Sequence, residues 1–318
     1  MGSVDESPEE FTILVTGFAP FKSEYPVNPS WEIASRLPEY LPQQANSAAG
    51  LPRVRIVVYP EPVRVNYQTV RRLVPRLWEG RSDKGDSSTK QPSSSSSLSS
   101  SSSSPPAPDT DAGRNFVPPA RIDLLLHIGM AGPRLHYALE RVGRRDGYYL
   151  RDVDDQLLGD TAADRADPQW EWYGVPAALE SDLDLDAVLQ RWRDYTNKSL
   201  PDGASHDLRI SGDAGRYLCD FIYTSSLAHL WKQGERRRVA FLHVPAAATA
   251  ERVAVGLGLV VELIRALAET ELAARQTAGG ADLAGGKMAT NATNTKVSAA
   301  AHTPAAGADT VTGKWYRD

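Results

Sequence analysis

The chain has 318 residues, of which 41% are hydrophobic and 24% are charged, and it contains one cysteine. A single cysteine excludes an internal disulfide and a zinc site built on several thiolates. The 35 Lys and Arg residues against 40 Asp and Glu residues give a formal net charge of -5, which offers no long-range attraction for a phosphate backbone. We therefore expect no nucleic-acid partner.

The segment with the longest apolar pattern, residues 253–268, is interrupted by Glu262 and Arg265. A bilayer requires roughly 20 mostly apolar residues in one helix, so we expect no membrane span. The first ten residues are acidic and polar, whereas a secretory signal is basic and then apolar. Together with the free thiol, this pattern predicts a cytoplasmic protein.

Three segments have the composition of a disordered chain. They are a polar lead-in at residues 1–9, a Ser-rich insertion at about residues 81–113, and a tail of Ala, Gly, Thr and Asn at residues 278–318. Such segments carry too few apolar side chains to offset the entropy that is lost on ordering. The rest of residues 10–277 is long enough for one domain with a single large core.

Within that domain, short apolar runs alternate with helical patterns. In chain order they predict a strand at 11–16, a helix at 28–37, a strand at 54–59, a helix at 67–78, a strand at 122–128, an extended segment at 135–142, helices at 184–195 and 216–231, a strand at 238–244 and a helix at 249–276. Strands that alternate with helices in this way form parallel sheets with crossover helices. We therefore expect a three-layer α/β domain.

The loops after the predicted strands carry residue types that catalysis uses. In open α/β sheets the reactive groups gather beyond the carboxyl ends of the strands, which here means residues 17–21, residues 129–132, the loop before Cys219, and His243. Cys219 follows a glycine-containing loop and lies in the first turn of a predicted helix, where backbone N–H groups favour a thiolate. A small buried core residue is the alternative interpretation.

His243 ends a predicted strand at the same sheet edge, which places its imidazole to accept the thiol proton, although a structural histidine is the alternative. A carboxylate is then needed to hold the imidazole in one tautomer. Glu140 is a candidate for that role, and a Glu140 that is solvated or salt-bridged beside Arg141 is the alternative. Spacing alone does not select between these interpretations.

Other chemistries lack their motifs. The sequence has no dinucleotide-binding glycine fingerprint, no phosphate-binding loop ending in Gly-Lys-Ser or Gly-Lys-Thr, no serine nucleophile elbow and no His-Glu-x-x-His helix. The six histidines show no ligand spacing. We therefore expect neither a cofactor nor a metal.

Six short motifs occur in order across the predicted domain. They are Gly-Phe-Ala-Pro-Phe at 17–21, Asn-Pro-Ser-Trp-Glu at 28–32, Gly-Met-Ala-Gly at 129–132, Leu-Glu-Arg at 139–141, Ala-Gly-Arg-Tyr-Leu-Cys at 214–219 and Phe-Leu-His-Val-Pro at 241–245. Each motif is weak alone, but the ordered set is specific, and it resembles the pyroglutamyl peptidase I family of cysteine exopeptidases. The resemblance implies an α/β/α sandwich around a mostly parallel, twisted sheet, in agreement with the fold argued above.

The resemblance also implies an activity. It places a catalytic triad at Glu140, Cys219 and His243, and its substrates are peptides with an N-terminal pyroglutamyl (5-oxoprolyl) residue, which the enzyme removes. It implies no cofactor and no obligate partner. Residues 10–277, without the Ser-rich insertion, are then expected to form the catalytic domain.

A pyroglutamyl ring is an uncharged lactam with one N–H donor and one carbonyl acceptor, so its pocket should be mostly apolar with a few amide partners. By resemblance, Phe18 and Phe21 form aromatic walls, Asn28 lies near the substrate, and Tyr217 and Leu218 complete the pocket beside the nucleophile. Without the resemblance, both phenylalanines would be interpreted as core residues and Asn28 as a helix N-cap.

The chain departs from the family pattern in several places. Met130 stands where many members carry Gln, Asp220 follows the nucleophile where Asn is common, and residues 142–149 and 246–248 differ from the usual continuation. The adjacent carboxylate of Asp220 is expected to raise the pKa of the thiol.

Two alternative functions stay open. One is a catalytically silent relative that acts as an intracellular binding module, with the Ser run as a phosphorylated docking segment, and the other is a hydrolase of another lactam or amide.

Overall fold

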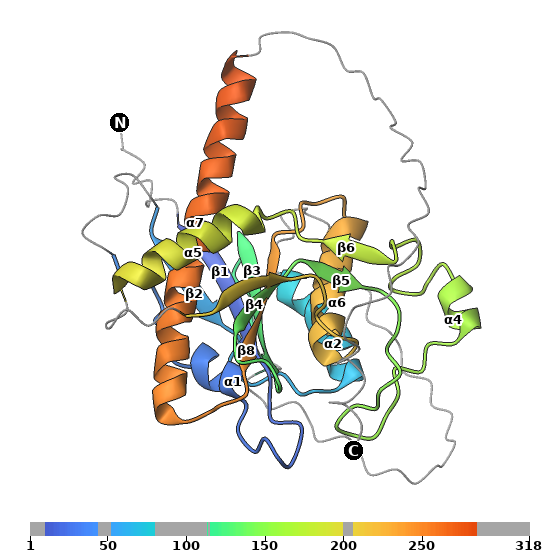
Figure 1. Cartoon of the computed structure of the whole chain (residues 1–318). Helices are drawn as coiled ribbons and strands as arrows, with labels where there is room; N and C mark the ends of the chain where they lie inside the picture. The colour runs from blue at the N-terminus through green and yellow to red at the C-terminus, as the bar shows by residue number, and fades with distance from the viewer. Residues whose placement is uncertain (1–9, 44–51, 80–112, 114, 200–205, 285–318) are drawn as a thin grey trace, which may run out of the picture.

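The structure is a computed structural model that describes residues 10–43, 52–79, 113, 115–199 and 206–284 (Figure 1), with side chains described as far as residue 277. The predicted lead-in, the tail beyond residue 284 and the Ser-rich insertion, apart from Gly113, lie outside the described residues. Gly113 lies against α2 (Tyr67–Trp78), because its carbonyl accepts a hydrogen bond from Arg76 at 2.9 Å.

A six-stranded sheet forms the middle layer of the molecule. In spatial order its strands are β2 (Val54–Val58), β1 (Phe11–Gly17), β3 (Leu124–Ala131), β8 (Val239–Pro245), β4 (Tyr137–Glu140) and β7 (Leu208–Ser211). The first four run parallel, β4 is antiparallel to β8, and β7 is parallel to β4. β1 and β3 are buried along their whole length, as parallel strands are when helices cover both faces of a sheet.

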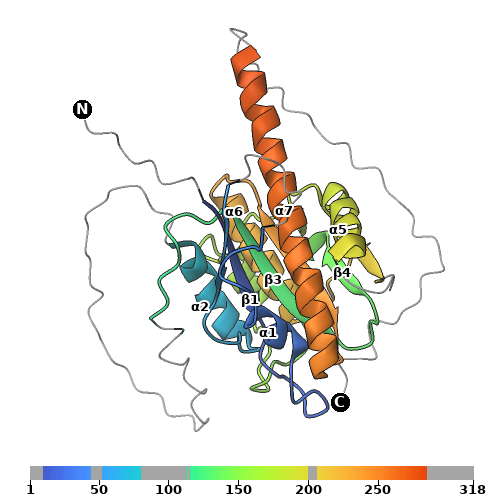
Figure 2. The ribbon, with the colours of Figure 1, turned by 90° about the vertical axis from the view of Figure 1, so that its left-hand side faces the viewer.

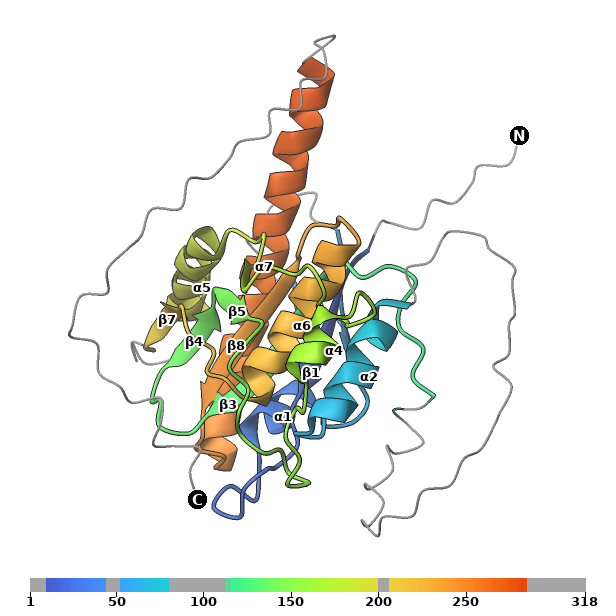
Figure 3. The ribbon, with the colours of Figure 1, turned by 90° about the vertical axis from the view of Figure 1, so that its right-hand side faces the viewer.

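Helices cover both faces of this sheet. α1 (Pro29–Ala34), α5 (Leu185–Ser199) and α7 (Ala250–Ala284) lie on the face that Figure 2 turns towards the viewer. α2 and α6 (Leu218–Lys232) pack together on the other face, shown in Figure 3, and the short helix α4 (Ala162–Ala166) lies further out on this side of the molecule. The strands β5 (Val142–Arg144) and β6 (Ala178–Glu180) form a small second sheet against α6. The predicted three-layer α/β/α sandwich with a mostly parallel sheet is therefore confirmed.

Each face of the sheet has its own hydrophobic core. Leu126 and Trp192 belong to the core under α1, α5 and α7, and Phe221 and Phe241 belong to the core under α2 and α6. Burial of one such large side chain contributes about 1.5–3 kcal/mol. α6 is buried on nearly all sides over its first three turns, so its N-terminus is held firmly against the sheet.

The structure departs from the predicted elements mainly where strands are short and polar. The sequence pattern does not predict β6, β7 or α4, and β7 has only one fully buried residue, Leu208, so it lacks an apolar run. The predicted extended segment at 135–142 contains β4, but the chain leaves the main sheet after Glu140 and continues as β5 in the second sheet. The antiparallel orientation of β4 is also not predicted.

Helix boundaries differ as well: α1 ends at Ala34 and α5 at Ser199, where the sequence predicts ends at residues 37 and 195. The helix predicted at 216–231 begins at Leu218, because Tyr217 has an extended backbone and is the N-cap residue. The last helix, predicted to end at residue 276, continues to Ala284 and enters the segment expected to be disordered tail. No helix in the part of the chain that the structure describes combines the length and the apolarity needed to cross a bilayer.

Candidate active site

Cys219 lies directly against the sheet, packed on the strand that neighbours the strand of His243. Gly129 of β3 and His243 of β8 are register partners. A Cβ atom on Gly129 would lie 2.8 Å from Sγ of Cys219 and 2.7 Å from Cζ of Phe241. The sulfur therefore rests on the one strand position beside His243 where the absence of a side chain leaves room for it.

The start of α6 gives Cys219 this position. Gly215 has a positive φ, which turns the preceding loop, and the N-cap residue Tyr217 makes no side-chain capping hydrogen bond. The N-cap side chain thus accepts no hydrogen bond from the N–H groups of the first helical turn, and the helix dipole adds positive partial charge there. This end of the helix can stabilise negative charge that develops near the sulfur.

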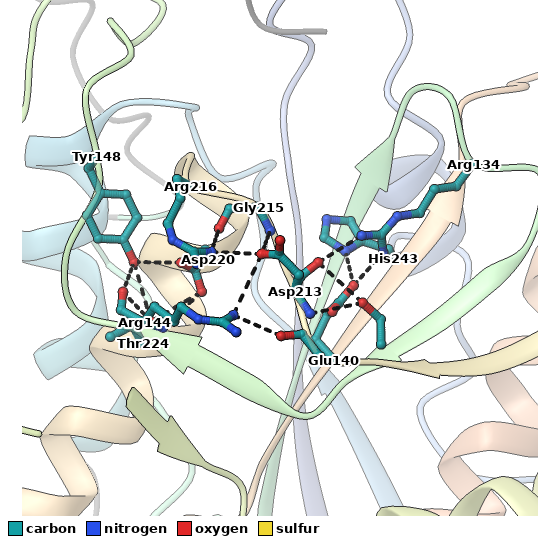
Figure 4. A network of polar contacts seen from close by, with 12 residues as sticks. Arg134, Glu140, Arg144, Tyr148, Asp213, Gly215, Arg216, Asp220, Thr224 and His243 are labelled. Carbon is teal, nitrogen blue, oxygen red and sulfur yellow. Dashed lines mark hydrogen bonds and ion pairs between the residues drawn. The ribbon is translucent and has the colours of Figure 1, made fainter. Parts of the chain in front are cut away.

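Glu140 and His243 form a buried pair (Figure 4). Nδ1 of His243 lies 2.7 Å from Oε1 of Glu140, and the two residues are 2% and 0% exposed. Ala138 is the antiparallel register partner of His243, so Glu140, two residues further along β4, points to the same face of the sheet. An ionised carboxylate only accepts hydrogen bonds, so Nδ1–H of His243 donates to Glu140 and Nε2 is left to accept a proton.

The counter-ion of Glu140 is Arg134. Nη1 of Arg134 donates to Oε1 of Glu140 at 2.6 Å, whereas Arg141 pairs at 2.9 Å with Asp186 near the surface. The interpretation of Glu140 as a residue paired with its neighbour Arg141 is therefore wrong. Sequence reasoning missed Arg134, although its place just after the glycine loop of residues 129–132 is a usable signal.

The surroundings of Glu140 keep it ionised. Burial by itself would raise the pKa of Glu140, but the hydrogen bond from His243 and the charges of His243 and Arg134 lower it to about 2. A carboxylate is thus present at neutral pH to hold the imidazole.

The thiol does not ionise easily in this resting site. Burial, followed by the charge of Glu140, raises the pKa of Cys219 to about 12; Arg134 opposes this shift and Asp220 adds to it. Among the described residues, no hydrogen bond joins the sulfur to the His243 ring. The lowering of the thiol pKa expected from the helix N-terminus stays a prediction, whereas the rise expected from Asp220 is among the contributions in the folded chain.

A small pocket opens beside the half-buried Cys219. Its lining comprises Phe18, Phe21, Asn28, Val65, Met130, Tyr217, Leu218 and Cys219. The structure thus brings together all five side chains that the family resemblance assigns to the substrate pocket. Val65, in the loop before α2, is an addition that no sequence motif marks. The lining is apolar apart from an amide, a phenol and the thiol, which fits a small uncharged ring.

Asn28 holds the loop that forms one side of the pocket. Its Oδ1 accepts hydrogen bonds from N and Oγ of Ser30 at 3.1 and 2.8 Å, and its Nδ2 donates to the carbonyl of Ala19 at 2.9 Å. Asn28 is therefore the N-cap of α1 as well as a pocket residue. These bonds use one of the two Nδ2 hydrogens, which leaves the second for another acceptor.

Asp220, next to the nucleophile, is fully buried in a polar cluster (Figure 4). Its Oδ1 accepts from the backbone N–H of Arg144 and its Oδ2 accepts from the hydroxyl of Tyr148, both at 3.1 Å. Burial raises the pKa of Asp220 to about 7, although the Arg144 N–H and the charge of Arg216 partly offset this shift. The residues that replace the family's usual segment at 142–149 thus supply the partners of Asp220.

The chain is similar to known proteins of one kind. A sequence profile described as pyroglutamyl peptidase matches residues 110–262. Pyroglutamyl-peptidase 1 of Mus musculus is 31% identical over 241 residues, which cover 76% of this chain and 81% of the mouse protein. The Homo sapiens protein of the same name is 30% identical over the same shares. Pyrrolidone carboxyl peptidase from Thermococcus litoralis matches the fold with a TM-score of 0.52 at 16% identity, over 81% of this chain and 94% of that one.

Proposed function

This chain belongs to the pyroglutamyl peptidase family of cysteine peptidases, and from that membership and the site geometry we propose that it removes N-terminal pyroglutamyl residues from peptides through a thioester on Cys219. One observation carries the proposal. Cys219 lines the apolar pocket and also rests on the glycine that is paired with His243, whose imidazole Glu140 holds.

The raised thiol pKa favours proton transfer during the attack over a thiolate formed beforehand. Nε2 of His243 accepts the thiol proton while the Cys219 sulfur bonds to the pyroglutamyl carbonyl carbon. The imidazolium then protonates the leaving amine as the C–N bond breaks, which leaves a thioester and a peptide shortened by one residue. General-base assistance of this kind contributes about 10²- to 10⁴-fold.

Water completes the cycle. The neutral imidazole of His243 takes a proton from a water molecule, whose oxygen attacks the thioester carbonyl. Pyroglutamate leaves as the C–S bond breaks, and the thiolate recovers its proton from the imidazolium. The negative charge on the carbonyl oxygen in both steps lies near the uncapped N–H groups at the start of α6, and donors of this kind contribute about 10²- to 10³-fold each.

The pocket supports the same choice of substrate. Phe18, Phe21 and Tyr217 offer apolar and aromatic surface to the lactam ring, and the unused Nδ2 hydrogen of Asn28 offers a donor to the lactam carbonyl. A free glutamyl residue would bring two charges into this pocket without counter-ions. We therefore expect selectivity for the closed ring.

The test compares fluorophore release from a pyroglutamyl amide with release from the prolyl and glutamyl amides, using the full chain. We expect cleavage of the first only, and loss of that cleavage in Cys219→Ala with an unchanged unfolding temperature. No cleavage of any amide would favour the catalytically silent relative. Equal cleavage of all three would favour a hydrolase of broader amides. The cytoplasmic location expected from the lone thiol stays a prediction, which cell fractionation tests.

A further inference from the structure

Arg134 connects parts of the site that lie far apart in the chain (Figure 4). Its Nη1 donates to Oε1 of Glu140 at 2.6 Å, and its Nη2 donates to the backbone carbonyl of Asp213 at 2.8 Å. Glu140 ends β4, whereas Asp213 lies in the loop that leads from β7 into the helix of Cys219. One planar guanidinium therefore sets the carboxylate and the nucleophile loop relative to each other.

Arg134 also changes the charge of the site. Glu140 is a fully buried carboxylate, and its charge disfavours a thiolate at Cys219. A buried charge of this kind needs a counter-ion, and Arg134 supplies a permanent one at contact distance. The positive charge of Arg134 lowers the pKa of Cys219, whereas the negative charge of Glu140 raises it.

We propose that Arg134 is a positioning residue of the active site, which holds Glu140 against His243 and supplies the positive charge that stabilises the Cys219 thiolate during attack. This proposal deepens the peptidase function and rests on it for the roles of Cys219 and His243. Arg134 acts through its neighbours and is not itself placed in the substrate pocket.

Other charged and titratable groups face this site from each element packed against it. They are His136 in the loop before β4, Glu140 on β4, Arg144 on β5, Asp213, Arg216 and Tyr217 in the loop before α6, Cys219, Asp220 and Tyr223 on α6, and His243 on β8. Substitution of Arg134 removes none of these titratable groups from the chain. A shift in the pH dependence of both catalysis and thiol alkylation would therefore report the loss of the Arg134 charge.

The expected effect has a defined sign. Loss of a cation raises the proton affinity of the thiol, so the alkaline limb of the pH profile of kcat/KM should move to higher pH in Arg134→Gln. An opposite charge nearby typically shifts a pKa by about 1–3 units, and the 25% exposure of the Arg134 side chain places the expected shift at about one unit. Loss of the contacts should also lower kcat about tenfold.

The experiment uses two readouts on the full chain. The first is the pH profile of pyroglutamyl amide cleavage. The second is the rate of alkylation by iodoacetamide against pH, which reports Cys219 alone because the sequence has one cysteine. Both should shift together in Arg134→Gln, whereas a purely structural role would lower the rate without moving the pH limbs.

Two further variants separate charge from geometry. Arg134→Lys keeps the charge but loses the planar two-point contact, so its pH limbs should stay near those of the wild type while kcat falls. Arg141→Gln removes the same charge one residue beyond Glu140, where Arg141 pairs with the exposed Asp186, and its profiles should match the wild type.

An Arg134→Gln profile that superposes on the wild type, in a variant with an unchanged unfolding temperature, overturns the proposal. An equal shift of the pH profiles in Arg141→Gln overturns the proposal too, because the loss of any nearby arginine would then have the same effect. If Arg134→Gln does not fold, a wild-type kcat in Arg134→Lys refutes the positioning role. Failure of the wild type to cleave a pyroglutamyl amide would refute the proposed peptidase function, but the alkylation profiles would still test Arg134.

Discussion

Gly129→Ala places a methyl group where the Cys219 sulfur now rests. The new Cβ would lie 2.8 Å from Sγ and 2.7 Å from Cζ of Phe241, whereas ordinary contacts between such atoms are about 3.5–4.0 Å. Phe241 is fully buried and Cys219 is held in the first turn of α6, so neither can simply swing away. The sulfur must move by about 1 Å, and a displacement of this size costs about 10²-fold in rate. Overpacking should also lower the free energy of unfolding by about 1–3 kcal/mol.

The assay is kcat/KM for a fluorogenic pyroglutamyl amide, together with the unfolding temperature and the iodoacetamide rate at one pH. Gly212→Ala is the matched control, because Gly212 lies in the loop before the same helix and a Cβ there would have no heavy atom within 4 Å. We expect the control to keep wild-type activity. Wild-type kcat/KM and alkylation in Gly129→Ala would show that the sulfur does not rest on this glycine, and the proposed contact with the His243 strand would be refuted.

Three further predictions concern the surrounding side chains. Glu140→Gln should lower kcat by about 10²-fold or more with little change in KM, because the imidazole loses the ionised acceptor that orients it; an unchanged kcat would remove Glu140 from the mechanism. The pKa of Asp220 rises from 3.8 to about 7 on folding, so the folded state keeps a proton that the unfolded chain releases, and stability falls as pH rises through that window. Asp220→Asn should therefore be more stable than the wild type at about pH 8, and the difference in the free energy of unfolding should vanish near about pH 4. Urea unfolding at each pH measures this difference, which should change by at most about 1.4 kcal/mol per pH unit. Parallel curves of stability against pH for the two proteins would contradict the prediction. Phe21→Ala should raise KM about tenfold with kcat nearly unchanged, whereas Phe116→Ala, which removes a ring packed on Tyr59 outside the pocket, should leave KM alone; equal effects would exclude Phe21 from substrate binding.

Local sequence patterns predict much of the site. The glycine loop before a helical pattern places Cys219 at a helix start, and an apolar run that ends in His243 places the imidazole at the carboxyl end of a strand. Both follow from neighbours in the chain, since helix starts and parallel strand ends depend on local residues and periodicity. The substrate-pocket residues came from a family resemblance, and periodicity alone would have assigned Phe18 to the core, where it is indeed 3% exposed.

The partner of Glu140 shows where local reasoning ends. Arg141 is adjacent in sequence, but consecutive residues of an extended chain point to opposite faces, so it reaches Asp186 instead. Arg134 lies in the loop between β3 and β4, and it contacts Glu140 at the far end of β4, six residues along the chain. β4 itself runs against β8, a direction that no strand pattern reveals, because antiparallel and parallel strands of this length have the same side-chain period.

By itself the amino-acid sequence determined the α/β layers, the helix start under the nucleophile and the list of groups able to react. Only the tertiary structure decided the electrostatics of that nucleophile: His243 and Glu140 are 103 residues apart, and Gly129 meets Cys219 across the interface of sheet and helix. The pKa of a thiol depends on the water it loses and on the charges within a few ångströms. Those quantities belong to packing between distant segments, which is why the sequence left the ionisation of Cys219 open, whereas burial in the folded chain raises the pKa of its thiol.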